Sequence, residues 1–564
     1  MEALDWLVIG VFFLALIGII VWVVRQKQND SADYFLGGRD ATWLAIGASI
    51  FASNIGSEHL IGLAGAGASS GMAMAHWEIQ GWMILILGWV FVPFYTRSMV
   101  YTMPEFLERR YNPQSRTILS VISLVSYVLT KVAVTVYAGG LVFQQVFGIK
   151  ELWGIDFFWI AAIGLVVLTA LYTIFGGMKS VLYTSVLQTP ILLLGSLIIL
   201  VLGFKELGGW DEMMRVCGAV TVNDYGDTMT NLIRSNDDAN FPWLGALIGS
   251  AIIGFWYWCT DQFIVQRVLS GKNEMEARRG TIFGAYLKLL PVFLFLIPGM
   301  IAFALHQKYI GAGGEGFLPM LANRTANADA AFPTLVAKLL PAGVKGLVVC
   351  GILAALMSSL ASLFNSSAML FTIDFYKRFK PETPEKKLVG IGQIATIVIV
   401  VLGILWIPIM RSVGDVLYTY LQDVQSVLAP GIAAAFLLGI CWKRTSAQGG
   451  MWGLISGMVI GLTRLGAKVY YSNAGEVADS TFKYLFYDMN WLFFCGWMFL
   501  FCIIVVIVVS LATEAPTAEK IQGLVFGTAT KEQKAATRAS WNHWDIIHTV
   551  IILAITAAFY WYFW

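Results

Sequence analysis

The sequence predicts an all-α polytopic membrane protein, and two observations lead to this fold class. Apolar residues make up 58% of the 564 positions and charged residues only 13%, whereas soluble domains are charged at about a quarter of their positions. The apolar residues gather in segments of about twenty or more, the length that a helix needs to cross a bilayer. A helix satisfies its own backbone hydrogen bonds in lipid, so such segments favour a helical bundle.

Hydropathy places fourteen candidate segments along the chain, each able to cross roughly 30 Å of hydrocarbon. In the first, the run Leu7–Val24 is followed by Arg25 and Lys27 without a small-residue cleavage site, so we expect a retained helix and not a signal peptide. The segments lie near 5–25, 43–68, 74–96, 116–145, 156–174, 179–204, 242–268, 277–305, 333–373, 386–409, 413–440, 447–470, 487–512 and 545–563.

Basic residues concentrate in alternate connections between these segments. They are Arg97, Arg109, Arg110 and Arg116, then Arg267, Lys272, Arg278 and Arg279, then Lys377, Arg378, Lys380, Lys386 and Lys387. The positive-inside rule therefore predicts that these connections are cytoplasmic and that both termini lie outside. The polar segments 205–241 and 306–332 would be external loops, and 513–544 a cytoplasmic linker.

The second segment contains a stretch that is poorly suited to a continuous helix. Residues 47–67 read GASIFASNIGSEHLIGLAGAG, and glycine weakens helices. Close packing of small residues is one explanation. Glu58 and His59 favour another, because ionisable groups are costly in a membrane and are usually functional. We therefore expect a broken helix, whose free carbonyls and facing side chains bind a substrate and its coupling ion.

The stretch FASNIGSEHLIGLAG resembles the first core helix of the sodium/glucose cotransporter family within the solute:sodium symporters. The resemblance covers residues 30–470, and the pattern SNIGSEH is especially like the branch that carries myo-inositol. Further matches are YTMPEFLERRY at 101–111, LYTIFGGMKSVLYTSVLQT at 171–189, WYWCTDQFIVQRVLSGKN at 256–273, GAYLKLLPVF at 284–293, AALMSSLASLFNSS at 354–367 and FLLGICWKR at 436–444.

This resemblance implies an inverted repeat of five plus five helices, with discontinuous first and sixth core helices at 43–68 and 242–268. One helix would precede the core and three would follow it. The expected division is an extra helix and cytoplasmic loop in 1–42, the transporter core in 43–440, additional helices in 441–512, the linker 513–544 and a last helix in 545–564.

The resemblance also implies a sodium site between the first and eighth core helices. Its ligands would be the carbonyls of Ala52, Ile55 and Ala355 and the hydroxyls of Ser358 and Ser359. Adjacent serines on an apolar helix can instead bond back to the preceding turn.

A second sodium site, found in carriers that move two sodium ions per sugar, uses an Asp and a further hydroxyl. This sequence has Ser185 and Ala361 at those positions. We therefore expect one sodium ion per substrate.

A sugar or polyol presents hydroxyls and apolar C–H faces, so its pocket needs hydrogen-bonding groups and an aromatic platform. The resemblance places substrate contacts at Asn54, His59, Glu78, Tyr257, Trp258, Lys288 and Gln422. It places an inner gate at Tyr257 and an outer lid at Leu63, Trp77 and Tyr418. The aromatic run 256–258 could also belong to an interfacial belt, but it lies in mid-span.

Two departures from the family pattern bear on the cargo. Gly254 stands where several sugar carriers have Thr or Asn, and Gln425 stands where Thr is common. The missing side chain at 254 is expected to leave room for a larger or differently oriented ligand. A neutral hexose of the glucose or galactose type is the first expectation, and myo-inositol is the close alternative.

Other functions are less favoured. A carrier of sialic acid or short-chain acids needs a positive partner for its cargo, and the carboxylate of Glu78 argues against one. A sugar-gated sensor or channel could use the same scaffold. The five histidines show no spacing typical of metal or haem ligands, and we expect neither enzymatic activity nor a nucleic-acid or obligatory protein partner. Sodium, the solute and membrane lipid are the expected partners, in the plasma membrane (the inner membrane of the cell).

Overall fold

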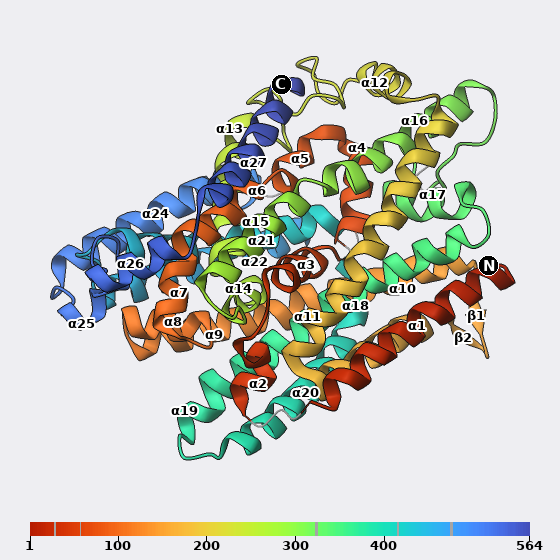
Figure 1. The fold of residues 1–564 in the computed structure, drawn as a ribbon. Coiled ribbons are helices and arrows are strands. Elements are labelled where there is room, and N and C mark those ends of the chain that lie inside the picture. The colour runs from red at the N-terminus through yellow and green to blue at the C-terminus, as the bar shows by residue number, and fades with distance from the viewer. Residues whose placement is uncertain (27–29, 57, 322–324, 414–416, 474–477) are drawn as a thin grey trace.

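The computed structural model describes residues 1–564 except 27–29, 57, 322–324, 414–416 and 474–477 (Figure 1). The described chain is almost entirely helical, and its only sheet is the hairpin of β1 (Glu151–Leu152) and β2 (Ile155–Asp156). Ten of the described helices are long and apolar enough to cross a membrane. The predicted all-α membrane fold is therefore confirmed.

Many helices in the first half of the chain are divided by short 3₁₀ or π segments, which carry the label η. The elements are α1 (Ala3–Val24), α2 (Ser31–Leu36), η1 (Gly37–Arg39), α3 (Trp43–Asn54), η2 (Glu58–Leu63), α4 (Ala64–Ser70), η3 (Gly71–Met74), α5 (Ala75–Glu78), α6 (Gly81–Ile86), η4 (Leu87–Phe91), α7 (Val92–Ser98), α8 (Met103–Arg110), α9 (Pro113–Ser126), η5 (Tyr127–Val132), α10 (Ala133–Phe147), α11 (Phe157–Leu207) and α12 (Trp210–Gly218).

Longer helices dominate the second half. The elements are α13 (Trp243–Gly254), η6 (Phe255–Thr260), α14 (Gln262–Leu269), α15 (Glu274–Lys288), η7 (Val292–Leu296), α16 (Ile297–Gly311), η8 (Ala328–Ala330), α17 (Ala331–Leu339), α18 (Val344–Met369), η9 (Leu370–Tyr376), α19 (Lys377–Phe379), α20 (Glu385–Val413), α21 (Leu417–Cys441), α22 (Ala447–Asn473), α23 (Thr481–Lys483), η10 (Tyr484–Asp488), α24 (Trp491–Ala512), α25 (Ala518–Ile521), α26 (Lys531–Ala539) and α27 (His543–Tyr562).

The two predicted helix interruptions are present. Helix α3 ends at Asn54, Ile55 has extended backbone angles (φ −78°, ψ 101°), and helical structure resumes at Glu58. In the second interrupted helix, Asp261 is extended (φ −77°, ψ 127°) between η6 and α14, and its side chain accepts a hydrogen bond from the Phe263 N–H. Both breaks expose backbone groups inside the bundle.

The fourteen apolar segments do not form fourteen uninterrupted helices. Segments 156–174 and 179–204 are joined in the 51-residue α11, whose only non-helical residue is Gly177 (φ 53°, ψ −150°). A Cβ at Gly177 would lie 2.4 Å from the carbonyl oxygen of Tyr34, so this kink requires glycine. Segment 333–373 is divided between α17 and α18. The count of fourteen spans stays a prediction.

Both termini lie at the end of the bundle that carries the two long polar loops. The Asp5 carboxylate of α1 accepts hydrogen bonds from the N–H groups of Gly343 and Gly346, at the start of α18. The Phe563 carbonyl accepts one from Leu232 in the 205–241 loop, and Figure 1 shows the C-terminus beside α12. The structure thus agrees with termini and loops on one side, while the choice of that side as the outside stays a prediction.

The linker 513–544 packs at the opposite end, against the connections rich in basic residues. Lys520 donates to the Glu108 carbonyl at 3.0 Å, and Thr537 contacts Arg97 and Glu274. Helix α18 lies at the centre of the bundle and is buried along nearly its whole length. The predicted division of the chain into functional parts is not tested by these contacts.

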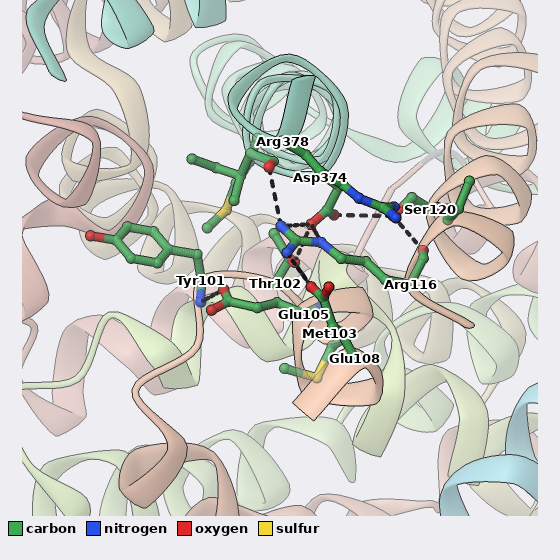
Figure 2. A network of polar contacts seen from close by, with 12 residues as sticks. Tyr101, Thr102, Met103, Glu105, Glu108, Arg116, Ser120, Asp374 and Arg378 are labelled. Atoms are coloured by element: carbon green, nitrogen blue, oxygen red, sulfur yellow. Dashed lines mark hydrogen bonds and ion pairs between the residues drawn. The ribbon is translucent and has the colours of Figure 1, made fainter. Parts of the chain in front are cut away.

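A buried ion-pair network joins α8, α9 and η9 at this same end (Figure 2). The Asp374 carboxylate accepts hydrogen bonds from Thr102 at 2.8 Å, Arg116 at 2.7 Å and Ser120 at 3.2 Å. Arg116 also donates to Glu108 and to the Ile373 carbonyl. Both carboxylate oxygens of Asp374 and all three guanidinium nitrogens of Arg116 are therefore paired within the protein.

Candidate functional site

A narrow polar cavity of about 40 Å³ lies between the two interrupted helices. This space is smaller than the roughly 300–1,000 Å³ that is usual for small-molecule sites, so a solute requires the walls to move apart. All seven predicted substrate contacts line it. The complete lining is Asn54, Glu58, His59, Trp77, Glu78, Gln80, Ile253, Gly254, Tyr257, Trp258, Lys288, Gln422 and Gln425.

The two π segments present the central side chains. Glu58 and His59 come from η2, which follows the first break, and Tyr257 and Trp258 come from η6, which precedes the second. π-helical turns recur at functional sites because the extra residue redirects neighbouring side chains. Both π segments form where glycine and polar residues interrupt an apolar run of the sequence.

Glu78 forms the charged centre of the cavity. One of its carboxylate oxygens, Oε2, lies 2.6 Å from Lys288 Nζ and 3.2 Å from His59 Nε2. The three side chains are almost fully enclosed, with 1%, 4% and 3% of their surface exposed. Because a lone buried charge is costly, the pairing of Glu78 with Lys288 lets both side chains remain in the membrane interior.

Asn54 connects this centre to the aromatic side of the cavity. Its Oδ1 accepts a hydrogen bond from Lys288 at 3.2 Å, and its Nδ2 donates to the Tyr257 hydroxyl at 3.1 Å. Lys131 Nζ lies 4.7 Å from the Tyr257 ring centroid and 2.7 Å from the Asp261 carboxylate. Tyr257 therefore lies between the cavity and a second buried ion pair at the break of the sixth core helix.

Three polar atoms around the cavity have no hydrogen-bond partner among the described residues. They are Nδ1 of His59, Nε1 of Trp77 and Oε1 of Gln422. An unsatisfied buried donor or acceptor costs about 1–3 kcal/mol. A ligand with several hydroxyls can supply partners to all three, because each hydroxyl both donates and accepts.

The predicted gate residues have different positions. Trp77 lines the cavity and stacks on Trp491 of α24, with ring centroids 5.5 Å apart. Tyr257 also lines the cavity, and Leu63 is buried outside the cavity lining. The side chain of Tyr418 lies outside the described residues. Opening and closing at these positions stay predictions.

Two of the elements predicted to hold the cation approach each other beside the first break. The last helical hydrogen bond runs from the Ile55 N–H to the Phe51 carbonyl at 3.0 Å, so the carbonyls from Ala52 onward lie at the free end of α3. Ser359 of α18 approaches this end, since a Cβ built on Gly56 would lie 3.1 Å from its hydroxyl oxygen. Ala355 lies one turn away on the same buried helix. This geometry offers neutral oxygens of the type that suits a monovalent cation.

The serine pair does not follow the alternative of bonding back to its own helix. Among the described residues, the Ser358 hydroxyl contacts that of Ser185 at 3.3 Å, whereas it is Ser362 that bonds back to the Ser358 carbonyl. Ser185 donates to the Val181 carbonyl at 2.6 Å, and Ala361 is fully buried. The position predicted for a second sodium site thus holds hydroxyls and no carboxylate.

The cavity wall also contains Gln80 and Ile253, which the sequence did not single out, and Glu58, which it marked as functional without placing it among the substrate contacts. A polar residue in an apolar segment was the available signal for Gln80. The expectation that Gly254 leaves room for a ligand is wrong, because a Cβ at Gly254 would lie only 2.4 Å from Oε1 of Gln80. The amide of Gln80 fills the space.

Comparison with known proteins gives consistent results. Residues 34–457 match the model of the sodium:solute symporter family. The chain is 37% identical over 542 residues to sodium/myo-inositol cotransporter 2 of Mus musculus, covering 94% of this chain and 80% of that protein. It is 37% identical over 551 residues to the sodium/myo-inositol cotransporter of Canis lupus familiaris, covering 93% and 76%.

A solved structure also shares the fold. The substrate-bound, outward-open state of a Na⁺-coupled sialic acid symporter superposes with a TM-score of 0.72 and 22% identity, over 92% of this chain and 99% of that one. This similarity shows the fold alone. The family match extends over most of the chain and includes both interrupted helices, so the chain belongs to the sodium:solute symporter family and is a sodium-coupled membrane transporter, not an enzyme.

Proposed function

We propose that this transporter imports a neutral polyol together with sodium, and that myo-inositol is preferred to a hexose. The observation that carries the proposal is the convergence of all seven predicted substrate contacts on one enclosed cavity with unsatisfied donors and acceptors. The related cotransporters are named for myo-inositol, which favours this solute over the hexose that the sequence first suggested.

The charge of the cavity supports a neutral cargo. Lys288 is the cation nearest to a bound solute, but its ammonium group is already paired with Glu78. Glu58 adds a second carboxylate to the wall. An anionic substrate such as a sialic acid would have to displace Glu78 from Lys288, which leaves a buried carboxylate without its partner.

The free end of α3 and Ser359 support sodium binding next to the solute. In the proposed cycle, sodium holds α3 against α18, and the solute then binds to side chains that follow the same break. Closure at Trp77 and opening at Tyr257 would release both on the other side. We place the protein in the plasma membrane with both termini outside.

Serine at position 185, in place of the Asp of a second sodium site, supports a ratio of one sodium ion per solute. One charge crossing a potential of about 100 mV contributes roughly 2.3 kcal/mol. A tenfold sodium gradient adds about 1.4 kcal/mol, and each 1.4 kcal/mol corresponds to a tenfold concentration ratio. Added together, these two contributions correspond to a concentration ratio on the order of several hundred, so a single ion is enough to drive accumulation of the solute.

Uptake into proteoliposomes tests this function. The full chain is reconstituted and an inward sodium gradient is imposed with labelled myo-inositol, glucose, galactose or sialic acid outside. We expect concentrative uptake with the highest kcat/KM for myo-inositol, and its loss when sodium is replaced by potassium. Higher kcat/KM for sialic acid than for every neutral solute would overturn the proposal.

Two variants make the test specific. Gln422→Ala removes an unsatisfied cavity acceptor and should weaken uptake. Gln144→Ala is the matched control, since Gln144 pairs with Asp156 far from the cavity wall. A sensor or channel on this scaffold would give solute-gated sodium current without accumulation of label.

A further inference from the structure

We propose that Gln80 is a specificity-determining substrate contact, whose side-chain carbonyl oxygen accepts a hydrogen bond from one hydroxyl of the solute. The inference rests on the proposed function, because it assigns this contact to the same cavity. Gln80 is outside the predicted substrate set, and only 2% of its surface is exposed.

A local break in the helix brings Gln80 into the cavity. In a regular helix, residues two apart point to different sides, so Glu78 and Gln80 would not share a face. Here α5 ends at Glu78, Ile79 and Gln80 have backbone angles of φ −78°, ψ 20° and φ −84°, ψ 24°, and α6 begins at Gly81. The altered turn lets Trp77, Glu78 and Gln80 all line the wall.

Gly254 provides the space that the Gln80 amide occupies. A Cβ at this position would lie 2.4 Å from Oε1, 2.9 Å from Cδ and 3.1 Å from Nε2 of Gln80. Any other residue at 254 would therefore displace the amide. Gly254 and Gln80 act together. Gly254 leaves α13 without a side chain at this point, and Gln80, between α5 and α6, places its amide in the space.

The orientation of the amide follows from its anchor. Gln80 Nε2 donates to the Ser250 carbonyl at 2.8 Å, one turn before Gly254 on α13. A carbonyl can only accept, so the nitrogen must face Ser250 and the oxygen faces away from it. Among the described residues, no hydrogen bond to Oε1 is present, and Gln80 belongs to the cavity lining.

The cavity thus offers a fixed acceptor at Gln80, in addition to the unsatisfied Trp77 N–H and the Gln422 carbonyl oxygen. A site built to hydrogen-bond a hydroxyl rejects an analogue that lacks it, because the buried protein group then has no partner. We therefore assign to Gln80 the discrimination between solutes that differ at one ring hydroxyl.

Uptake of single-deoxy analogues tests this assignment. The analogue series is made from whichever neutral solute the wild-type protein transports best, so a substrate other than myo-inositol changes the series and not the test. We expect the wild type to lose about tenfold in kcat/KM on one particular deoxy analogue, the loss that a hydrogen bond of ordinary strength predicts.

The variant Gln80→Leu keeps the approximate size of the side chain and removes the acceptor. It should lower kcat/KM for the parent solute about tenfold and leave that for the one deoxy analogue nearly unchanged. Gly254→Ala displaces the Gln80 amide without removing it, so this variant should also reduce the difference in kcat/KM between the parent solute and the deoxy analogue. Gln144→Leu, far from the cavity, should keep wild-type selectivity.

Other results overturn the inference. If Gln80→Leu lowers uptake of the parent and of every deoxy analogue by one common factor, Gln80 has only a structural role. Unchanged selectivity in both Gln80→Leu and Gly254→Ala would also contradict it. If the wild type transports no neutral polyol or sugar, the proposed function fails as well. If the wild type is selective among the deoxy analogues but Gln80→Leu does not change that selectivity, this inference alone fails and the proposed function stands.

Discussion

The network around Asp374 and the network around Glu78 both contain a buried carboxylate paired with a cation, but they differ in what remains unpaired. Asp374 and Arg116 have all their side-chain polar atoms bonded to protein groups (Figure 2). Around Glu78 the wall of the cavity keeps unsatisfied atoms on His59, Trp77 and Gln422.

This difference separates a structural ion pair from a binding site. In a saturated network every donor and acceptor has a partner, so a ligand can gain nothing there. In the cavity the unsatisfied groups have a cost that a ligand can remove. The fraction of polar atoms left without partners is thus a better indicator of function than the presence of a buried charge.

The largest effect is expected at the saturated network. Asp374→Asn removes the fully buried carboxylate from Arg116 and leaves only the partly exposed Glu108 as its partner, which should lower the free energy of unfolding toward the lower end of about 3–5 kcal/mol. Denaturant unfolding in detergent measures this change. The double variant with Arg116→Met should recover part of the loss, and a decrease below about 1 kcal/mol would refute the structural assignment.

The second largest effect is expected from a substitution at the cation site. Ser359→Ala removes the hydroxyl that approaches the break, and we expect the sodium concentration for half-maximal uptake to rise about tenfold or more. Sodium titration of uptake measures it. Ser367→Ala is the control, because this buried serine of α18 has no hydrogen-bond partner in the described chain and lies two turns beyond Ser359. Equal effects of both variants would argue against a cation at the break.

A smaller effect is expected from the unsatisfied acceptor in the cavity. Gln422→Ala should raise the KM for the solute about fivefold to tenfold, in line with one lost hydrogen bond, with little change in the free energy of unfolding. The contrast with Asp374→Asn is the point of the experiment. A stability loss as large as that at Asp374 would erase the distinction between the two regions.

The smallest effect is expected for an ion pair outside both networks. Asp479 pairs with Lys483 at 2.8 Å, but its side chain is 94% exposed. Asp479→Asn should therefore leave the free energy of unfolding almost unchanged, because an exposed ion pair gains little in water. A larger change would mean that burial does not determine the strength of these pairs.

The sequence was informative where its residues conflict with a membrane helix. Glycine and polar residues around Asn54 predicted the first break. Glu78 and Lys288 were expected as separate substrate contacts, and the pair that they form with each other was not predicted. Contacts between residues far apart in the sequence were not predictable in this way. Arg116 and Asp374 are 258 residues apart, and nothing local in either segment indicates the other.

Gln80 was missed for a different physical reason. On a regular helix it points away from Glu78, and only the altered turn at Ile79 and Gln80 brings both residues to one wall. The stack of Trp77 on Trp491 likewise depends on how α24 packs against the core. Helix periodicity does not contain either fact.

The ratio of labelled sodium to labelled myo-inositol entering the same proteoliposomes tests the central claim most directly. A cation held by the free end of α3 and Ser359, with serine in place of a carboxylate at position 185, predicts coupled entry at a ratio near one. Entry of myo-inositol without sodium, or a ratio near two, would contradict this account.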